Sequence, residues 1–361
     1  MKRGSRCYNQ GLPVSLSPVG EWLLDSGIQE PGGGVARYHR ADLGRNLPVS
    51  VEITGYAASA LVYLHRVTGQ AVYLERALAS ARFLTRTAWD AQAAALPFEL
   101  DPPAYTYFFD CGIVVRGLLA VWRATGDAEC LSTAIAIGRA MASDFRAADG
   151  TLHPILALPS KQPVALDPGS WSRSDGCYQL KSAMAWWDLA EAAGDASFRE
   201  PYEHTLDGAL RTWENFLPGH SEGHRVMDRL HAFLYFLEGL LPVAGDARCA
   251  AVLAEGILRT ERFLNDLAGD FARSDVYAQL LRMRVFAAGC GAAPLDRRAA
   301  ESEARQLAKF EAPGGGYYFG RKGGEWLPHV NPVSAVFALQ ALELWRSASA
   351  GAPPADRHLL I

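Results

Sequence analysis

The sequence predicts an all-α protein in which six helical hairpins close into a ring. Nearly apolar helical segments alternate with amphipathic ones along the 361 residues. Short turns containing glycine, several of them Thr-Gly or Gly-Asp, join the two segments of each pair. An unpaired amphipathic segment near the start is balanced by an unpaired apolar segment near the end. A closed ring pairs these two segments, because the first helix then becomes the outer partner of the last inner helix.

The first elements establish the pattern. Residues 18–28 form the unpaired amphipathic helix, and residues 52–67 form a helix that is apolar on almost every side. After a turn at Gly69, residues 71–89 carry charged side chains at helical spacing, as expected of a helix with one face in solvent. An inner, buried helix followed by an outer, solvated helix is therefore the repeating unit.

Four further pairs follow in the same order, and a final apolar helix covers residues 331–345. The pairs are 110–124 with 128–145, 174–193 with 196–216, 228–244 with 247–267, and 274–288 with 295–310. The turn glycines are irregularly spaced, which favours a closed ring over the alternative of an open α-solenoid. No linker rich in serine, proline or charge interrupts the pairs, so we expect a single domain over residues 1–361.

Composition excludes several classes of function. With 35 basic and 39 acidic side chains the formal charge is −4, which gives no electrostatic reason to bind nucleic acid. Six cysteines lie far apart without a Cys-x-x-Cys pair, as expected of reduced thiols in the cytoplasm. No signal peptide and no apolar run of membrane-spanning length is recognisable. The sequence thus predicts a cytoplasmic protein.

Several motifs carry a family resemblance. Gly32-Gly33-Gly34-Val35, Glu52-Ile53-Thr54-Gly55-Tyr56 and Phe109-Asp110-Cys111-Gly112, with the Thr-Gly-Asp turns, resemble the six-hairpin (α/α)6-barrel superfamily. The chain is most similar to bacterial members associated with polysaccharide metabolism, over about residues 18–346. The superfamily includes unsaturated glucuronyl hydrolases, other glycosidases, sugar 2-epimerases and uronate-acting enzymes. The resemblance implies an (α/α)6 toroid and a carbohydrate substrate, and it does not identify the reaction.

In such a ring the starts of the inner helices converge on one mouth, and here all six starts are acids or an amide. They are Glu52, Asp110, Asp175, Asp228, Asp275 and Asn331. Helix capping explains some of them, since Asp, Asn and Ser are preferred at helix N-termini and acids are favoured in the first turn. Capping does not explain the bulky polar and aromatic residues beside them.

Glycoside hydrolysis needs one carboxylic acid and one carboxylate whose pKa values are pushed apart. We expect Asp110, which follows Tyr-Phe-Phe, to be the general acid, because an apolar environment raises a carboxyl pKa. Asp175, close to Arg173, is the expected base. Glu52 is a further catalytic candidate, although Ser50 could cap its helix. Asp228 and His231 share a helix face and could form an acid–imidazole pair for proton abstraction, unless His231 is simply a buried core histidine.

Around these acids we expect side chains that bind the sugar. Tyrosine and tryptophan present an apolar face with a polar tip, and arginine pairs with carboxylates, which hints at a uronic acid. Two glycine-rich loops, at residues 31–34 and 313–316, are expected to turn tightly and bring aromatic residues to the rim. The candidate binding residues are Tyr38, His39, Arg40, Tyr107, Trp171, Arg173, Tyr178, Tyr277, Gln279, Trp326, His329 and Asn331.

The sequence therefore predicts a carbohydrate-active enzyme, with glycoside hydrolysis of an oligo- or polysaccharide as the first hypothesis. Epimerisation of a sugar or uronate, or polysaccharide elimination, is the alternative reaction. A ring that binds a saccharide without cleaving it is the alternative from another class. We expect no metal and no organic cofactor, because no Cys-His dipeptide or clustered aspartate motif is present.

Overall fold

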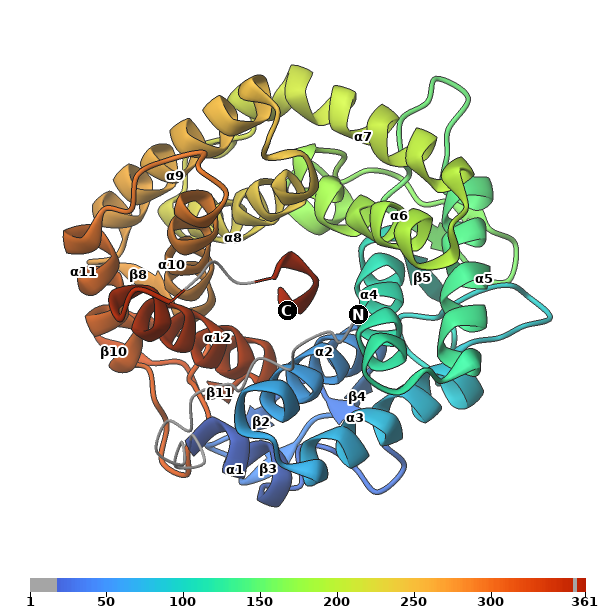
Figure 1. Cartoon of the computed structure of the whole chain (residues 1–361), viewed down its shortest axis with the longest axis horizontal. Helices are drawn as coiled ribbons and strands as arrows, with labels where there is room; N and C mark the ends of the chain where they lie inside the picture. The colour runs from blue at the N-terminus through green and yellow to red at the C-terminus, as the bar shows by residue number, and fades with distance from the viewer. Residues whose placement is uncertain (1–17, 353–355) are drawn as a thin grey trace, which may run out of the picture.

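The protein is a ring of two concentric layers of helices (Figure 1). The computed structural model describes residues 18–352 and 356–361. The inner layer consists of α2 (Val51–Thr68), α4 (Phe108–Thr125), α6 (Leu180–Ala193), α8 (Gly223–Gly239), α10 (Ser274–Gly289) and α12 (Pro332–Ser349). The outer layer consists of α1 (Pro18–Asp25), α3 (Ala71–Phe83), α5 (Ala128–Asp144), α7 (Arg199–Thr212), α9 (Ala247–Leu267) and α11 (Arg297–Ala308). Helix α12 contacts both α2 and α1, so the ring is closed.

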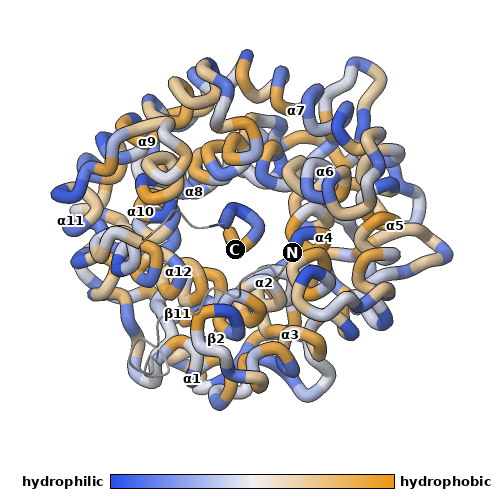
Figure 2. The backbone as a smooth tube through the Cα atoms, in the orientation of Figure 1, coloured by the Kyte–Doolittle hydropathy of each residue, from blue (hydrophilic) through white to orange (hydrophobic). Residues whose placement is uncertain are grey.

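The sequence pattern accounts for the two layers. Inner helices pack against neighbours on both sides and against the outer layer, so apolar residues occupy most of their surface. Outer helices keep one face in water, and Figure 2 shows their hydrophilic segments along the circumference. No helix in the described ranges combines the length and apolarity needed to cross a membrane.

Glycines allow the inner helices to approach each other closely. A Cβ on Gly112 of α4 would lie 2.5 Å from Cα of Ser182 in α6, and a Cβ on Gly117 would lie 2.5 Å from the carbonyl oxygen of Gly55 in α2. Contacts below 3 Å are not tolerated, so only glycine fits at these two positions of α4. Helix α4 is thereby held tightly between its two inner neighbours.

Two helix starts differ from the sequence prediction. Helix α6 begins at Leu180 rather than at residue 174, because two 3₁₀ turns, Trp171–Arg173 and Cys177–Gln179, precede it. Helix α8 begins at Gly223 rather than at residue 228, since the buried Val226 and Met227 already belong to its apolar stripe. Asp175 therefore lies before its helix, and Asp228 lies within the second turn of its helix, so neither residue begins a helix as predicted.

Short antiparallel strands build the connections at the mouth of the ring. The strands are β1 (Val35–Ala36), β2 (His39–Arg40), β3 (Arg45–Asn46), β4 (Val49–Ser50), β5 (Tyr105–Tyr107), β6 (Ile155–Ala157), β7 (Gln162–Pro163), β8 (Phe271–Arg273), β9 (Gly320–Lys322), β10 (Glu325–Trp326) and β11 (His329–Val330). They form four small sheets, and β11 pairs with β2, which joins the last connection to the first. The two ends of the ring are therefore joined by paired strands as well as by packed helices.

Both glycine-rich loops turn tightly, as the sequence predicts. Gly33 and Gly315 have φ of 92° and 95°, in the left-handed region. A Cβ on Gly33 would lie 2.2 Å from the carbonyl oxygen of Ala79, and one on Gly315 would lie 2.2 Å from that of Pro18. Each loop is thus pressed against an outer helix, which fixes the strands that follow it.

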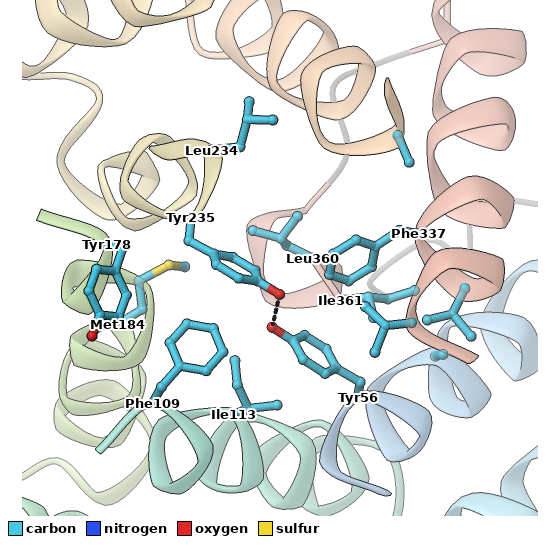
Figure 3. Packing of buried hydrophobic residues seen from close by; sticks show 14 of the residues in the cluster. Tyr56, Phe109, Ile113, Tyr178, Met184, Leu234, Tyr235, Phe337, Leu360 and Ile361 are labelled. Atoms are coloured by element: carbon cyan, nitrogen blue, oxygen red, sulfur yellow. Dashed lines mark hydrogen bonds between the residues drawn. The ribbon is translucent and has the colours of Figure 1, made fainter. Parts of the chain in front are cut away.

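The centre of the ring is filled rather than open. Residues 356–361 lie inside it, and Leu360 and Ile361 are buried against inner-helix side chains such as Phe337 (Figures 1 and 3). Figure 3 also shows the hydroxyls of Tyr56 from α2 and Tyr235 from α8 meeting across the interior, 2.9 Å apart. Cavities remain on both sides of this packing, one near the N-terminal ends of the inner helices and one between the C-terminal ends of α2 and α4 and residues 356–359.

Candidate active site

A cavity of about 280 Å³ lies where several inner helices begin. Five of the six inner helices line it, namely α2, α4, α8, α10 and α12, and the connection that precedes α6 contributes Trp171 and Ser172. The polar and charged lining residues are Glu52, Asp110, Ser172, His231, Arg273, Asp275 and Asn331, and the aromatic ones are Phe98, Tyr107, Phe109, Trp171, Tyr235 and Phe319. Larger cavities of about 330, 400 and 470 Å³ lie elsewhere, but none of them gathers such a set of buried ionisable groups. This cavity is the candidate active site.

Glu52 and Asp110 are free for chemistry because other residues begin their helices. Ser50 is the N-cap of α2, where its hydroxyl accepts a hydrogen bond from the backbone N–H of Ile53 at 3.4 Å. Tyr107 occupies the N-cap position of α4 without a side-chain cap. Within the described residues, Oδ2 of the buried Asp110 has no hydrogen-bond partner. Capping therefore does not explain either carboxyl group.

Burial raises the pKa values of both carboxyl groups. Burial raises the pKa of Glu52 from 4.5 to about 7, against the opposing charge of Arg37. Burial also raises the pKa of Asp110 well above its usual value, and the negative charge of Glu52 raises it further. Each negative charge opposes the ionisation of the other carboxyl group, so the pair loses its two protons in separate steps. Between these steps the cavity holds one protonated acid and one carboxylate.

His231 of α8 lines the same cavity, and Gln279 and Asp275 contact its imidazole ring. Its Nδ1 lies 2.7 Å from Oε1 of Gln279 and 3.5 Å from Oδ2 of Asp275. Its ring makes edge contacts with Trp171 and Tyr235. Burial lowers the pKa of His231 to about 4, although Asp275 opposes this shift. The imidazole is consequently neutral at pH 7 and can act as a base.

Arg273, at the end of β8, was not among the predicted site residues. Its guanidinium donates two hydrogen bonds to Asp275, from Nε at 3.0 Å and from Nη2 at 2.5 Å, and a third to Asp228 at 2.7 Å. These charges outweigh the burial of the side chain and raise the pKa of Arg273. Asp228 therefore pairs with Arg273, and not with His231 as the sequence analysis expected.

Asp175 is not brought together with Asp110. It is exposed and lines the separate 400 Å³ cavity between the start of α6 and α7, together with His204 and Arg229. The cause is the late start of α6, which leaves Arg173 and Asp175 in a connecting loop with both side chains exposed. The expected pair of Asp110 with Asp175 is therefore replaced in the cavity by Asp110 with Glu52.

The predicted binding residues divide into three groups. Tyr107, Trp171 and Asn331 line the cavity, and Gln279 lies behind it against His231. Asn331 also caps α12, because its Oδ1 accepts hydrogen bonds from the backbone of Val333 and Ser334.

A second group lies on the rim or surface, outside the cavity lining. Tyr38 packs edge-on against His329, His39 contacts Asn46, Arg40 pairs with Asp42, and Trp326 is 40% exposed and stacks on Tyr318. The third group is structural. The Tyr178 hydroxyl donates to the carbonyl of Ser174 within the core, and Tyr277 lines a different cavity between α9 and α11.

Within the described residues, one group has the spacing of metal ligands, namely Asp188, Glu191 and His358. Arg116 and Arg357 donate to Asp188, and Arg357 also donates to Glu191, so these carboxylates already have cationic partners. The group lies outside the candidate active site.

The sequence matches no protein-family model, and a comparison with curated proteins finds no significant match. Solved structures are informative instead. A sugar epimerase from a ruminal bacterium superposes with a TM-score of 0.70 at 14% identity, over 91% of this chain and 96% of that one. The cellobiose 2-epimerase of Spirochaeta thermophila gives 0.69 at 16% identity, over 91% and 94%. An α-amylase from Clostridium perfringens gives 0.60 at 11% identity, over 93% and 99%.

This chain has their fold. The superpositions cover nearly the whole of both partners, so the shared architecture extends around the complete ring. The six-hairpin (α/α)6 toroid predicted from the sequence is thereby confirmed. At identities of 14% and 16% the similarity concerns the fold, and the chemistry has to be argued from the cavity.

Proposed function

We propose that the cavity binds a saccharide and hydrolyses a glycosidic bond, with Asp110 as the general acid and Glu52 as the ionised partner. The observation that carries this proposal is the convergence of two carboxyl groups with raised pKa values in one cavity, one of them without a hydrogen-bond partner in the described structure. Such a pair is what acid–base cleavage of an acetal requires.

We assign the acid role to Asp110 because it is the more deeply buried group and its Oδ2 has no hydrogen-bond partner within the described residues. Protonated Asp110 donates to the leaving oxygen as the glycosidic bond breaks. Ionised Glu52 either removes a proton from the attacking water or attacks the sugar itself, and the separation of the two carboxyl groups in the bound state decides between these courses. The aromatic walls, including Tyr107 and Trp171, offer flat apolar faces to a sugar ring.

Size and charge of the cavity limit the substrate. A volume of about 280 Å³ is just below the usual range for small-molecule sites, roughly 300 Å³ and above, which suits a small part of a saccharide rather than a long stretch of polymer. Arg37 lies close enough to influence the pKa of both carboxyl groups, and a uronate could pair with its guanidinium.

Epimerisation or isomerisation of a sugar is the second candidate, and His231 is the observation that favours it. A neutral imidazole in the cavity can remove a proton from a carbon next to a carbonyl group, and protonated Asp110 can return one. Two proteins of the same fold are described as sugar epimerases and a third as a D-mannose isomerase, the last with a TM-score of 0.67 at 8% identity.

One experiment separates the two reactions. The purified protein is incubated in D₂O with a panel of neutral and uronic-acid oligosaccharides and free sugars, and the products are followed by NMR. Hydrolysis produces new reducing ends without carbon-bound deuterium, whereas epimerisation produces a new diastereomer that carries deuterium at the inverted carbon. Elimination would show a new carbon–carbon double bond and would contradict both candidates.

Two aspartate variants, one as the test and one as its matched control, examine the role of Asp110. Asp110→Asn removes the acid from the cavity and should abolish either reaction, while Asp175→Asn changes an exposed aspartate in the other cavity and should leave turnover unchanged. Equal activity of Asp110→Asn and the unchanged protein would rule out the assigned acid. Saccharide binding measured by calorimetry without any product would instead support a binding or scaffold role.

A further inference from the structure

A chain of buried polar side chains leads from His231 away from the cavity. Oε1 of Gln279 lies 2.7 Å from Nδ1 of His231, and Nε2 of Gln279 donates to Oε1 of Glu238 at 3.5 Å. Lys181 and Arg282 donate to the same carboxylate, Lys181 at 2.6 Å. Gln279, Glu238, Lys181 and Arg282 are completely buried. The proposed hydrolysis and epimerisation leave this chain without a role.

The charge of Glu238 determines the direction of the hydrogen bonds in this series of side chains. It lies seven residues after His231 on α8, so the two side chains project from the same face two helical turns apart. The neighbouring charges of Arg282 and Lys181 lower the pKa of Glu238 despite its burial. An ionised carboxylate accepts hydrogen bonds and donates none.

This property fixes the orientation of the Gln279 amide. Its NH₂ group must face Glu238, because the opposite orientation would place the amide oxygen against a carboxylate and leave the NH₂ group against the imidazole. Oε1 of Gln279 therefore points at Nδ1 of His231. An amide oxygen only accepts, so Nδ1 must carry the proton of the bond.

Asp275 reinforces the same arrangement. Its Oδ2 lies 3.5 Å from Nδ1 of His231 and is held by Arg273. Nδ1 thus faces two acceptors, while Nε2 makes no hydrogen bond within the described residues. A neutral imidazole has one N–H, and with that proton on Nδ1 the lone pair must reside on Nε2.

We infer that Gln279, oriented by Glu238, holds His231 in the Nδ1–H tautomer, so that its Nε2 is the basic atom available to a ligand in the cavity. Gln279 and Glu238 are then positioning residues, since they act through His231 and do not line the cavity. The inference rests on the proposed function only for the identity of the ligand. In that function Nε2 would either take a proton from the substrate or accept a hydrogen bond from a sugar hydroxyl.

The tautomer can be measured on the full chain without any substrate. We suggest labelling the nine histidines with ¹⁵N and recording long-range ¹H–¹⁵N correlations at pH 7, with the signals of His231 assigned by their loss in His231→Asn. The expected spectrum shows a protonated Nδ1 and an unprotonated Nε2 for His231. A protonated Nε2 in the unchanged protein would overturn the inference.

Two variants test the cause. Gln279→Leu removes the acceptor and leaves Glu238 paired with Lys181 and Arg282, so the Nε2–H tautomer should become populated. Glu238→Gln frees the amide to turn and should mix the two tautomers. Should Glu238→Gln fail to fold, Gln279→Leu decides alone, and an unchanged Nδ1–H tautomer in that variant would overturn the role of Gln279.

The matched control is Gln340→Leu in α12. Gln340 is equally buried, but its amide contacts Arg282, Leu359 and Ile361 rather than His231. Its substitution should therefore leave the histidine tautomer unchanged. A tautomer change in this control would show that general loosening of the interior, and not the hydrogen bond, causes the effect.

Failure of this inference and failure of the proposed function are distinguishable. A saccharide panel without turnover would remove the proposed reaction and leave the tautomer measurement intact. A different tautomer would remove the role of Gln279 and leave the pair of Asp110 and Glu52 untouched.

Discussion

Nζ of Lys181 lies 2.6 Å from Oε2 of Glu238 inside the ring, and neither side chain has any exposed surface. Burial of two charges carries a desolvation cost of several kcal/mol per ion, so every partner matters. Arg282 provides a second cation, and the main-chain oxygen of Ile361 accepts from both Lys181 and Arg282. The segment 356–361 is thus bonded to the same polar cluster that lies behind the cavity.

Removal of one cationic partner of Glu238 should lower the stability of the protein. Burial lowers the pKa of Lys181 to about 7, so the side chain is a cation at pH 6. At that pH we expect Lys181→Met to lower the free energy of unfolding by about 3–5 kcal/mol, because it removes one of the two cations paired with a buried carboxylate. Urea unfolding followed by circular dichroism measures the effect. Lys309→Met, an exposed lysine that contacts only Gln306, is the control and should change stability by less than about 0.5 kcal/mol. Similar values for the two variants would show that the buried pair adds little.

The carboxyl pair predicts a specific dependence of stability on pH. The folded-state pKa of Glu52 is raised from 4.5 to about 7, so the folded state binds more protons than the unfolded state between these values. Stability is therefore greatest below pH 4.5 for this group and falls as the pH rises to about 7. Asp110 acts in the same direction, starting from its usual value of 3.8.

Neutral replacements should remove this loss. We expect Glu52→Gln and Asp110→Asn to be more stable than the unchanged protein at pH 8, by about 1–3 kcal/mol, and to show a smaller advantage at pH 5. Urea unfolding at the two pH values provides the comparison, with Asp175→Asn as an exposed control. An advantage that does not grow with pH would contradict the raised pKa values.

Close helix packing predicts opposite effects for two glycines. Gly112→Ala should destabilise the protein by more than about 3 kcal/mol or prevent folding, because the added methyl group would overlap Ser182 in α6. Gly208→Ala on the outer helix α7 meets only the end of Arg211, at 3.9 Å, and should stabilise by about 0.5–1 kcal/mol. Thermal unfolding of both variants tests this contrast, and a tolerated Gly112→Ala would mean that α4 and α6 can separate.

Arg273 should not be replaceable by lysine. Arg273→Lys keeps the charge but loses the two parallel hydrogen bonds to Asp275, so we expect a loss of about 1–3 kcal/mol in stability. Because Asp275 also faces Nδ1 of His231, the histidine signals should shift in the ¹⁵N spectrum. Arg225→Lys, near the rim, is the control and should leave the spectrum unchanged. Identical spectra for both variants would separate Arg273 from the histidine.

The sequence was sufficient to predict the ring because each hairpin repeats a simple contrast between a helix buried on all sides and a helix with one solvated face. It also identified Glu52, Asp110 and His231 as residues that share the cavity. Tyr235 was missed because it lies in the middle of α8, away from the helix starts, although it follows His231 by one helical turn on the same face.

The site was harder to predict because one short motif occurs twice. Arg-Ser-Asp appears at residues 173–175 and again at residues 273–275, and the predicted site residues Arg173 and Asp175 belong to the first. The second reaches the cavity because β8 leads directly into α10 and is held by pairing with β9. The first lies in the long connection between α5 and α6, where the 3₁₀ turn Cys177–Gln179 separates it from the helix. The two identical motifs thus lie in different environments, because one directly precedes its inner helix and the other belongs to a long connection.

The division of the cavity among separate hairpins has an evolutionary consequence. Glu52, Asp110, His231 and Asp275 come from four different inner helices, whereas the packing of the ring depends on other positions, such as Gly55, Gly112 and Gly117. A change in one connecting loop can therefore alter one wall of the cavity and leave the remaining walls and the scaffold in place. New specificities can arise on this architecture stepwise, one hairpin at a time.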